Sequence, residues 1–246
     1  MNSKIPHAPR HTGIVVAAGK SLRFGAETPK QYQLLAEKPL VAHCLKAMEE
    51  SFLDEILLVV AEGDEEYCRE NIIEPYGFHK VSTVLAGGKE RCHSVANALF
   101  HATKLKHIPN YVYIQDGARP FLRVALLEQL RDAALENGAS VAASKVTDTI
   151  KTGDLRGFVT GNPARESLFA VQTPQVFEFD GIISAYESLL SDAAPPKVTD
   201  DVEVYQRYTG RSVKLVVDNS VNMKITTKRD LIIAEALIDN GSEIML

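Results

Sequence analysis

Short apolar segments rich in β-branched residues alternate with helical patterns over the first 146 residues of this chain. The pattern predicts strands over residues 13–17, 56–60, 81–85, 111–114 and 140–146. It predicts helices over residues 39–48, 63–74, 90–104 and 122–136. A strand that is apolar at successive positions is buried on both faces, which is typical of a parallel sheet between layers of helices. We therefore expect an α/β fold with a Rossmann-like, mostly parallel sheet and helices on both faces.

The alternation stops after Val146. Residues 147–172 contain three glycines and a proline and show little periodicity, apart from short strands expected around Ile150 and at 157–159. Such a stretch is too long for a plain connector, so it is either functional or makes contacts of its own. Beyond it we expect helices over 178–190 and 201–208, a strand over 212–217 and a closing helix over 228–240. We expect a single domain over residues 1–246.

Composition excludes several classes of protein. The chain has 246 residues, of which 45% are hydrophobic and 24% charged, as in an ordinary globular protein. Its longest apolar run, residues 56–61, is far shorter than the roughly 20 residues that cross a bilayer. A net charge of -5 argues against a nucleic-acid partner. Three cysteines without a C-x-x-C pair, and no secretory signal at residues 1–12, favour a cytoplasmic protein with reduced thiols.

The loop after the first strand carries positive charge beside glycines. In open α/β sheets ligands bind beyond the carboxyl ends of the strands, so this loop is a place to look for a site. Over residues 18–31 it contains Gly19, Lys20, Arg23 and Lys30. Small residues let backbone N–H groups approach an anion, and Lys and Arg add charge, which suits a polyphosphate. The alternative is a solvated basic loop.

Asp116 ends the fourth predicted strand and is followed closely by Arg119. A carboxylate at this edge is well placed to bind Mg²⁺, which prefers oxygen ligands and often bridges to a phosphate. Arg119 could bind a phosphate through two hydrogen bonds. The alternative is a local turn in which the two residues form an ion pair.

Eight short motifs follow one another along the chain. They are Ala17-Ala18-Gly19-x-x-x-Arg23, Pro29-Lys30-Gln31-Tyr32, Gly87-Gly88-x-Glu90-Arg91-x-x-Ser94-Val95, Asp116-Gly117-Ala118-Arg119-Pro120, Asp148-Thr149-Ile150-Lys151, Gln172-Thr173-Pro174-Gln175-Val176-Phe177, Thr199-Asp200-Asp201 and Asn222-Met223-Lys224-Ile225-Thr226. Together these motifs resemble the 2-C-methyl-D-erythritol 4-phosphate cytidylyltransferase family. The resemblance runs in order from residue 13 to about residue 238, and the ordered set of motifs is highly specific.

The resemblance implies a reaction of CTP with a polyol phosphate that gives a CDP-polyol and pyrophosphate. It implies that Arg23, Lys30 and Lys224 are catalytic and stabilise the charge that develops on the phosphates. Asp116 would bind Mg²⁺ or another divalent cation as well as the nucleotide. The remaining nucleotide-binding residues would be Ala17, Ala18, Gly19, Gly88 and Ser94, the last two recognising cytosine.

The resemblance also gives the irregular segment a role. Residues 147–172 match a protruding β-arm through which members of the family form a homodimer. Thr149 and Arg165 lie in this arm and Thr173 just beyond it. By resemblance these three residues bind the methylerythritol phosphate, and Arg119 and Thr199 complete the same pocket.

Several positions depart from the family pattern. These are Val16 where proline is typical, Lys89 where an acidic residue is common, Gln115 for histidine, Gly117 for alanine and Asp201 for glutamate. The alternatives left open are a ribitol 5-phosphate cytidylyltransferase that makes CDP-ribitol, a transferase that uses UTP or GTP with a sugar 1-phosphate, and a non-catalytic nucleotide-binding regulator.

Overall fold

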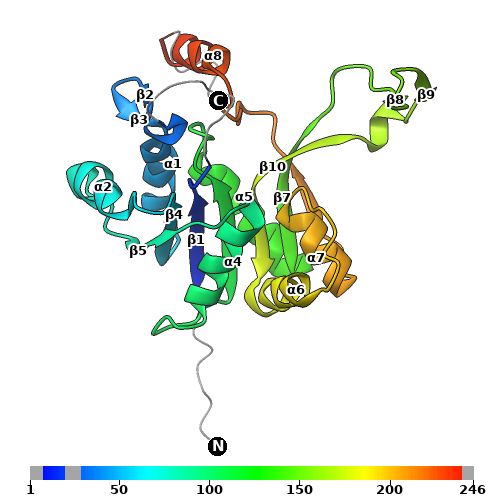
Figure 1. The fold of residues 1–246 in the computed structure, drawn as a ribbon. Helices are drawn as coiled ribbons and strands as arrows, with labels where there is room; N and C mark the ends of the chain where they lie inside the picture. Colours follow the sequence, from blue (N-terminus) through cyan, green and yellow to red (C-terminus); the bar gives the residue numbers. More distant parts are fainter. Residues whose placement is uncertain (1–7, 20–28, 240–246) are drawn as a thin grey trace, which may run out of the picture.

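The computed structural model describes residues 8–19 and 29–239. Within them, seven strands form one sheet in the order β11-β7-β10-β6-β1-β4-β5 (Figure 1). All neighbouring strands run parallel except β10, which is antiparallel to both β6 and β7. The strands are β1 (His11–Val16), β4 (Glu55–Val60), β5 (Val81–Ala86), β6 (Tyr111–Asp116), β7 (Ala139–Lys145), β10 (Phe169–Glu178) and β11 (Lys214–Val217).

Helices cover both faces of this sheet, as the apolar strands predict. Side chains of β4 alternate between two cores: Ile56, Leu58 and Val60 face one, and Leu57 and Val59 face the other. Helices α1 (Leu40–Glu49) and α5 (Val124–Asn137) pack on the first face. Helices α4 (Arg91–Ala102), α6 (Phe179–Ser191) and α7 (Asp201–Thr209) pack on the second. The Rossmann-like, mostly parallel sheet is confirmed.

The central position of β10 differs from the prediction. We expected residues up to 172 to belong to the irregular segment and a helix to follow from 178. Instead Phe169–Glu178 is a ten-residue strand between β6 and β7. Pro174 lies in its middle, and its pairing with β7 shifts register between Val171 and Gln175. Proline cannot donate to a sheet ladder, so the strand pattern was interrupted at this point in the sequence.

Other elements differ in their bounds. The residues predicted as one helix over 63–74 form α2 (Glu65–Cys68), the π-helix η2 (Arg69–Ile73) and α3 (Glu74–Tyr76). A hairpin of β2 (Leu34–Leu35) and β3 (Lys38–Pro39), which was not predicted, precedes α1. The predicted short strands around Ile150 and at 157–159 lie instead at β8 (Thr152–Gly153) and β9 (Val159–Gly161).

The segment that contains β8, β9 and the short helix η3 (Arg165–Ser167) projects from the sheet (Figure 1). Its apolar side chains Leu155, Phe158 and Val159 are exposed, so they bury no core within the chain. At another corner, α8 (Lys228–Asp239) lies beside the β2–β3 hairpin and shares a small core with it (Figure 1). No helix in the described part of the chain is long and apolar enough to cross a membrane.

Candidate active site

A cavity of about 220 Å³ opens where β1 and β6 end. Its walls come from the end of β1 and the residues after it, the η1 helix (Lys30–Tyr32), the loop between β5 and α4, and the end of β6. The lining residues are Val16, Ala17, Ala18, Gly19, Lys30, Gln31, Gly88, Lys89, Glu90, Arg91, Ser94, Asp116, Ala118 and Lys224. The cavity thus lies at the carboxyl edge of the sheet, where α/β folds bind their ligands.

The cavity brings together the predicted nucleotide-binding residues and two predicted catalytic residues. Lys30 and Lys224 are 194 positions apart in the sequence, yet both line the same hollow. The Lys30 Nζ atom donates a hydrogen bond of 3.2 Å to the carbonyl of Ile225, next to Lys224. The third predicted catalytic residue, Arg23, lies outside the described residues.

The loop between β5 and α4 packs closely on both sides because it contains two glycines, Gly87 against the residues after β1 and Gly88 against α4. A Cβ atom on Gly87 would lie 2.3 Å from the Cβ of Ala18, and one on Gly88 would lie 2.4 Å from the Cβ of His93. The Gly88 N–H donates to the Ser94 Oγ at 3.0 Å, which fixes the loop on the first turn of α4. Gly88 therefore presents its backbone to the cavity, where an approaching ligand meets no side chain from this position.

Asp116 is a buried carboxylate surrounded by cations. Lys224 Nζ donates to its Oδ2 at 2.7 Å, Arg91 Nε donates to its Oδ1 at 3.1 Å, and Arg119 Nε lies 3.9 Å from Oδ2. Burial alone would raise the pKa of Asp116, but the charges of Arg91, Lys224 and Arg119 outweigh it and hold that pKa below its ordinary value. Asp116 is therefore an ionised acceptor at neutral pH.

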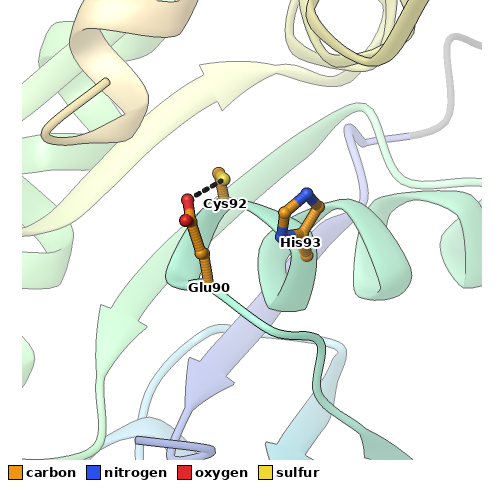
Figure 2. Close-up of side chains that lie close together, drawn as sticks. All are labelled: Glu90, Cys92 and His93. Atoms are coloured by element: carbon orange, nitrogen blue, oxygen red, sulfur yellow. Dashed lines mark hydrogen bonds between the residues drawn. The ribbon is translucent and has the colours of Figure 1, made fainter. Parts of the chain in front are cut away.

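The residues around Asp116 fit a magnesium–polyphosphate complex. An ionised carboxylate that lines a cavity, with Lys30 and Lys224 in the same wall, supplies an oxygen ligand for the metal and charge for the phosphates. Among the described residues, one other group places possible metal ligands together: Glu90, Cys92 and His93, with donor atoms within 4.8 Å (Figure 2). Its sulfur and nitrogen donors do not suit Mg²⁺, and we assign this group no role.

Two predicted acceptor residues lie directly beside Asp116. The Thr173 Oγ1 accepts a hydrogen bond of 3.0 Å from the Asp116 backbone N–H. Arg119 donates from Nη1 to the Asn222 carbonyl at 2.6 Å, while its buried Nε has no hydrogen-bond partner. A buried donor without a partner is costly, so a ligand oxygen at this point would be stabilising.

The other three predicted acceptor residues lie elsewhere. Arg165 donates to the Thr149 Oγ1 at 3.0 Å, and both residues are exposed on the projecting arm rather than in the cavity wall. Thr199 donates to Glu203 at 3.0 Å and borders a smaller hollow that also contacts Arg91. Within one chain, the five residues predicted to bind the acceptor therefore do not form one pocket.

Sequence reasoning missed the partners of Arg91. This residue bonds Asp116 and, through both Nη atoms, Asp201, which in turn accepts from the Tyr186 hydroxyl. Arg91 and Asp201 both lie in motifs that were singled out, but nothing in the sequence paired them. Tyr186 carried no signal, since its spacing is that of an ordinary buried helix residue.

The fold and the cavity define a class: a Rossmann-like α/β protein with an anion-binding pocket at the carboxyl edge of its sheet. A family model described as IspD: 2-C-methyl-D-erythritol 4-phosphate cytidylyltransferase matches residues 12–240. The chain belongs to this family.

Two curated relatives and a solved structure agree with this assignment. A 2-C-methyl-D-erythritol 4-phosphate cytidylyltransferase of Geotalea uraniireducens (strain Rf4) is 41% identical over 230 residues, which is 93% of this chain and 97% of the relative. One of Alkaliphilus oremlandii (strain OhILAs) is 41% identical over 94% of this chain and 95% of its own length. The crystal structure of 4-diphosphocytidyl-2C-methyl-D-erythritol synthase from Anaerococcus prevotii DSM 20548 superposes with a TM-score of 0.80 at 28% identity. It covers 94% of this chain and 99% of its own.

Proposed function

We propose that this chain is a nucleotidyltransferase that converts CTP and 2-C-methyl-D-erythritol 4-phosphate to 4-(CDP)-2-C-methyl-D-erythritol and pyrophosphate, a step in isoprenoid precursor synthesis. The observation that carries the proposal is the single cavity in which Lys30, Lys224 and Asp116 meet the backbone of residues 17–19 and Gly88. None of the relatives described above is named for ribitol 5-phosphate, so we do not favour that acceptor.

The reaction requires positioning and charge rather than a covalent intermediate. An oxygen of the acceptor phosphate attacks the α-phosphorus of CTP, a new P–O bond forms, and the bond to pyrophosphate breaks. Negative charge builds on the α-phosphate and on the leaving group, where preorganised cations are most effective. Lys30 and Lys224 supply these cations from one wall of the cavity, and Arg23 completes the set in our proposal.

Asp116 is the residue that would bind Mg²⁺ or another divalent cation. The cation, when bound, would neutralise phosphate charge in the ground and transition states. The Gly88 backbone and Ser94 would read the cytosine, and Ala17, Ala18 and Gly19 would contact the nucleotide.

The acceptor would lie beside Asp116, next to Arg119 and Thr173. Thr149, Arg165 and Thr199 would complete its pocket, and we propose that Thr149 and Arg165 come from the arm of a second chain. The exposed Leu155, Phe158 and Val159 support a homodimer, because an arm without a core of its own is stabilised by burial against a partner. Sedimentation velocity should give a dimer that Phe158→Glu dissociates; a monomer for the unchanged chain would contradict this part.

We also propose a cytoplasmic location. The three cysteines, Cys44, Cys68 and Cys92, are all free thiols in the structure, as is usual in a reducing compartment. Fractionation of cells that express the chain should recover it with cytoplasmic markers, and recovery with secreted or membrane markers would contradict this location.

The test is pyrophosphate release with CTP, Mg²⁺ and 2-C-methyl-D-erythritol 4-phosphate. Parallel reactions replace the acceptor with ribitol 5-phosphate, or CTP with UTP. We expect turnover with CTP and methylerythritol phosphate to exceed that of either replacement. Faster turnover with ribitol 5-phosphate would reassign the acceptor, and CTP binding without any pyrophosphate release would show a regulator instead of an enzyme.

A further inference from the structure

An ion pair lies behind Asp116, formed by Arg91, which lines the cavity, and Asp201, which is buried and does not line it. Arg91 donates from its two Nη atoms to the two oxygens of Asp201, at 2.9 and 2.8 Å. Its Nε donates to Oδ1 of Asp116 at 3.1 Å. Asp201 is 0% exposed and lies 110 positions away in the sequence. One guanidinium therefore joins a buried carboxylate to the carboxylate of the proposed metal site.

Asp201 is itself held in place from two sides. The Tyr186 hydroxyl donates to Asp201 Oδ1 at 2.5 Å, and the Tyr186 side chain is 0% exposed. The backbone N–H of Asp201 donates to Oε1 of Gln175 at 3.0 Å, and Gln175 belongs to β10. Because its partners are on the sheet and on α6, the carboxylate has a fixed orientation. A planar, bidentate pair then fixes the guanidinium of Arg91 as well.

This arrangement limits what Arg91 can offer Asp116. While both Nη atoms donate to Asp201, the hydrogen bond from Arg91 to Asp116 comes from Nε and goes to Oδ1. The other oxygen, Oδ2, is left to Lys224 at 2.7 Å. If Asp201 lost its charge, Arg91 would be free to turn and bind both oxygens of Asp116, because bidentate pairing is the favoured geometry of Arg with a carboxylate.

We propose that Asp201 and Tyr186 are positioning residues that act through Arg91. They restrict Arg91 to one oxygen of Asp116 and so keep the second oxygen for an exchangeable partner. That partner is Lys224 in the free chain and a divalent cation when the nucleotide is bound. The proposal rests on the proposed function, since it concerns the same site and the same metal.

The test is a Mn²⁺ titration in the presence of CTP and without an acceptor, followed by electron paramagnetic resonance. No turnover is needed, so binding is measured apart from catalysis. We expect Asp201→Asn to weaken Mn²⁺ binding roughly tenfold or more, the usual effect of losing a residue that orients a metal ligand. Asp201→Glu keeps the charge and should restore most of the affinity. Tyr186→Phe should weaken binding in the same direction by less.

Two matched variants separate positioning from stability. Asp218→Asn breaks another ion pair with a buried carboxylate, Arg123–Asp218 at 2.9 Å, in a loop that does not line the cavity. Tyr113→Phe removes another buried hydroxyl, which bonds His11 at 3.0 Å at the far end of β6. Both should lower the melting temperature and leave Mn²⁺ affinity unchanged.

The outcomes are distinct. Unaltered Mn²⁺ affinity in Asp201→Asn would overturn the proposal, and so would an equal loss of affinity in Asp218→Asn. If Asp201→Asn does not fold, unaltered affinity in a folded Tyr186→Phe overturns it. If the unchanged chain binds no Mn²⁺ with CTP, the proposed function itself fails, before any variant is compared.

Discussion

The paired strands β1 and β6 bury one titratable side chain at each end, His11 at the amino end and Asp116 at the carboxyl end. The two side chains have different neighbours. At the amino end His11 pairs in register with Tyr111, and at the carboxyl end Val16 pairs with Asp116. His11 and Asp116 are both 7% exposed. His11 lies among the rings of Phe52, Tyr111 and Tyr113. Asp116 lies among Arg91, Lys224 and Arg119.

The neighbours decide the charge state. Burial lowers the pKa of His11, and the nearby Asp54 only partly offsets this effect, so the imidazole is neutral. At Asp116 the same burial is outweighed by cations, and the carboxylate stays charged. The amino end of the sheet is therefore packed around a neutral side chain. The carboxyl end contains several buried or half-buried charges, which apolar packing does not require. Such charge is typical of a site that binds a charged ligand.

The largest effect should come from removing a cation at the carboxyl end. We expect Lys30→Ala to lower kcat by about 10²- to 10³-fold, because a preorganised charge at such a site contributes roughly 3–4 kcal/mol to lowering the barrier. Arg131→Ala is the matched loss of a cation at the amino end, where Arg131 stacks on Phe52. Its kcat should be unchanged. Steady-state pyrophosphate release measures the kcat of both variants. A near-normal rate in Lys30→Ala would show that a cation at the carboxyl end matters no more to catalysis than one at the amino end.

The next effect concerns stability at the carboxyl end. Asp116→Asn leaves Arg91 and Lys224 without this counter-charge and should lower the free energy of unfolding by about 2–3 kcal/mol. This is less than the ~3–5 kcal/mol for a fully buried pair, since both cations reach solvent. Urea unfolding without ligands measures this loss of stability.

The same Asp116→Asn variant should lose much of its Mg²⁺ dependence. An unchanged metal titration would argue against Asp116 as a ligand.

The smallest effect is a pH dependence at the amino end. With a lowered pKa, His11 stays neutral in the folded chain at a pH where the unfolded chain, with a pKa near 6.5, already binds a proton. Stability should therefore be unaffected well above pH 6.5, fall as the pH drops from 6.5 toward the lowered pKa, and level off below that pKa. The loss by pH 5.5 is at most about 1.4 kcal/mol, the limit for a group that binds no proton in the folded chain. Urea unfolding at pH 7.5, 6.5 and 5.5 measures it.

The matched variant is His11→Gln, which cannot titrate and should lack this part of the acid sensitivity. A variant as acid-sensitive as the unchanged chain would show that His11 already titrates normally, and the contrast between the two ends would then disappear.

The sequence predicted the alternating half of the fold well, because apolar strands and amphipathic helices leave local patterns. It missed β10, since Pro174 interrupts the pattern and the strand is recognised only by its position between β6 and β7. The motifs predicted that Lys30, Gly88, Asp116 and Lys224 meet, because loops at the carboxyl ends of parallel strands share one edge. The pairing of Arg91 with Asp201 could not be predicted, because it depends on where β10 places the segment that begins α7.

The central claim is that the phosphates of a nucleotide bind between Lys30, Lys224 and Asp116. A crystal structure with CTP and Mg²⁺ bound tests it most directly. We expect the α-phosphate to contact Lys30 and Lys224, the metal to contact Asp116, and the cytosine to lie against Gly88 and Ser94. A triphosphate bound away from these residues, with the Lys224–Asp116 ion pair unchanged, would contradict the claim.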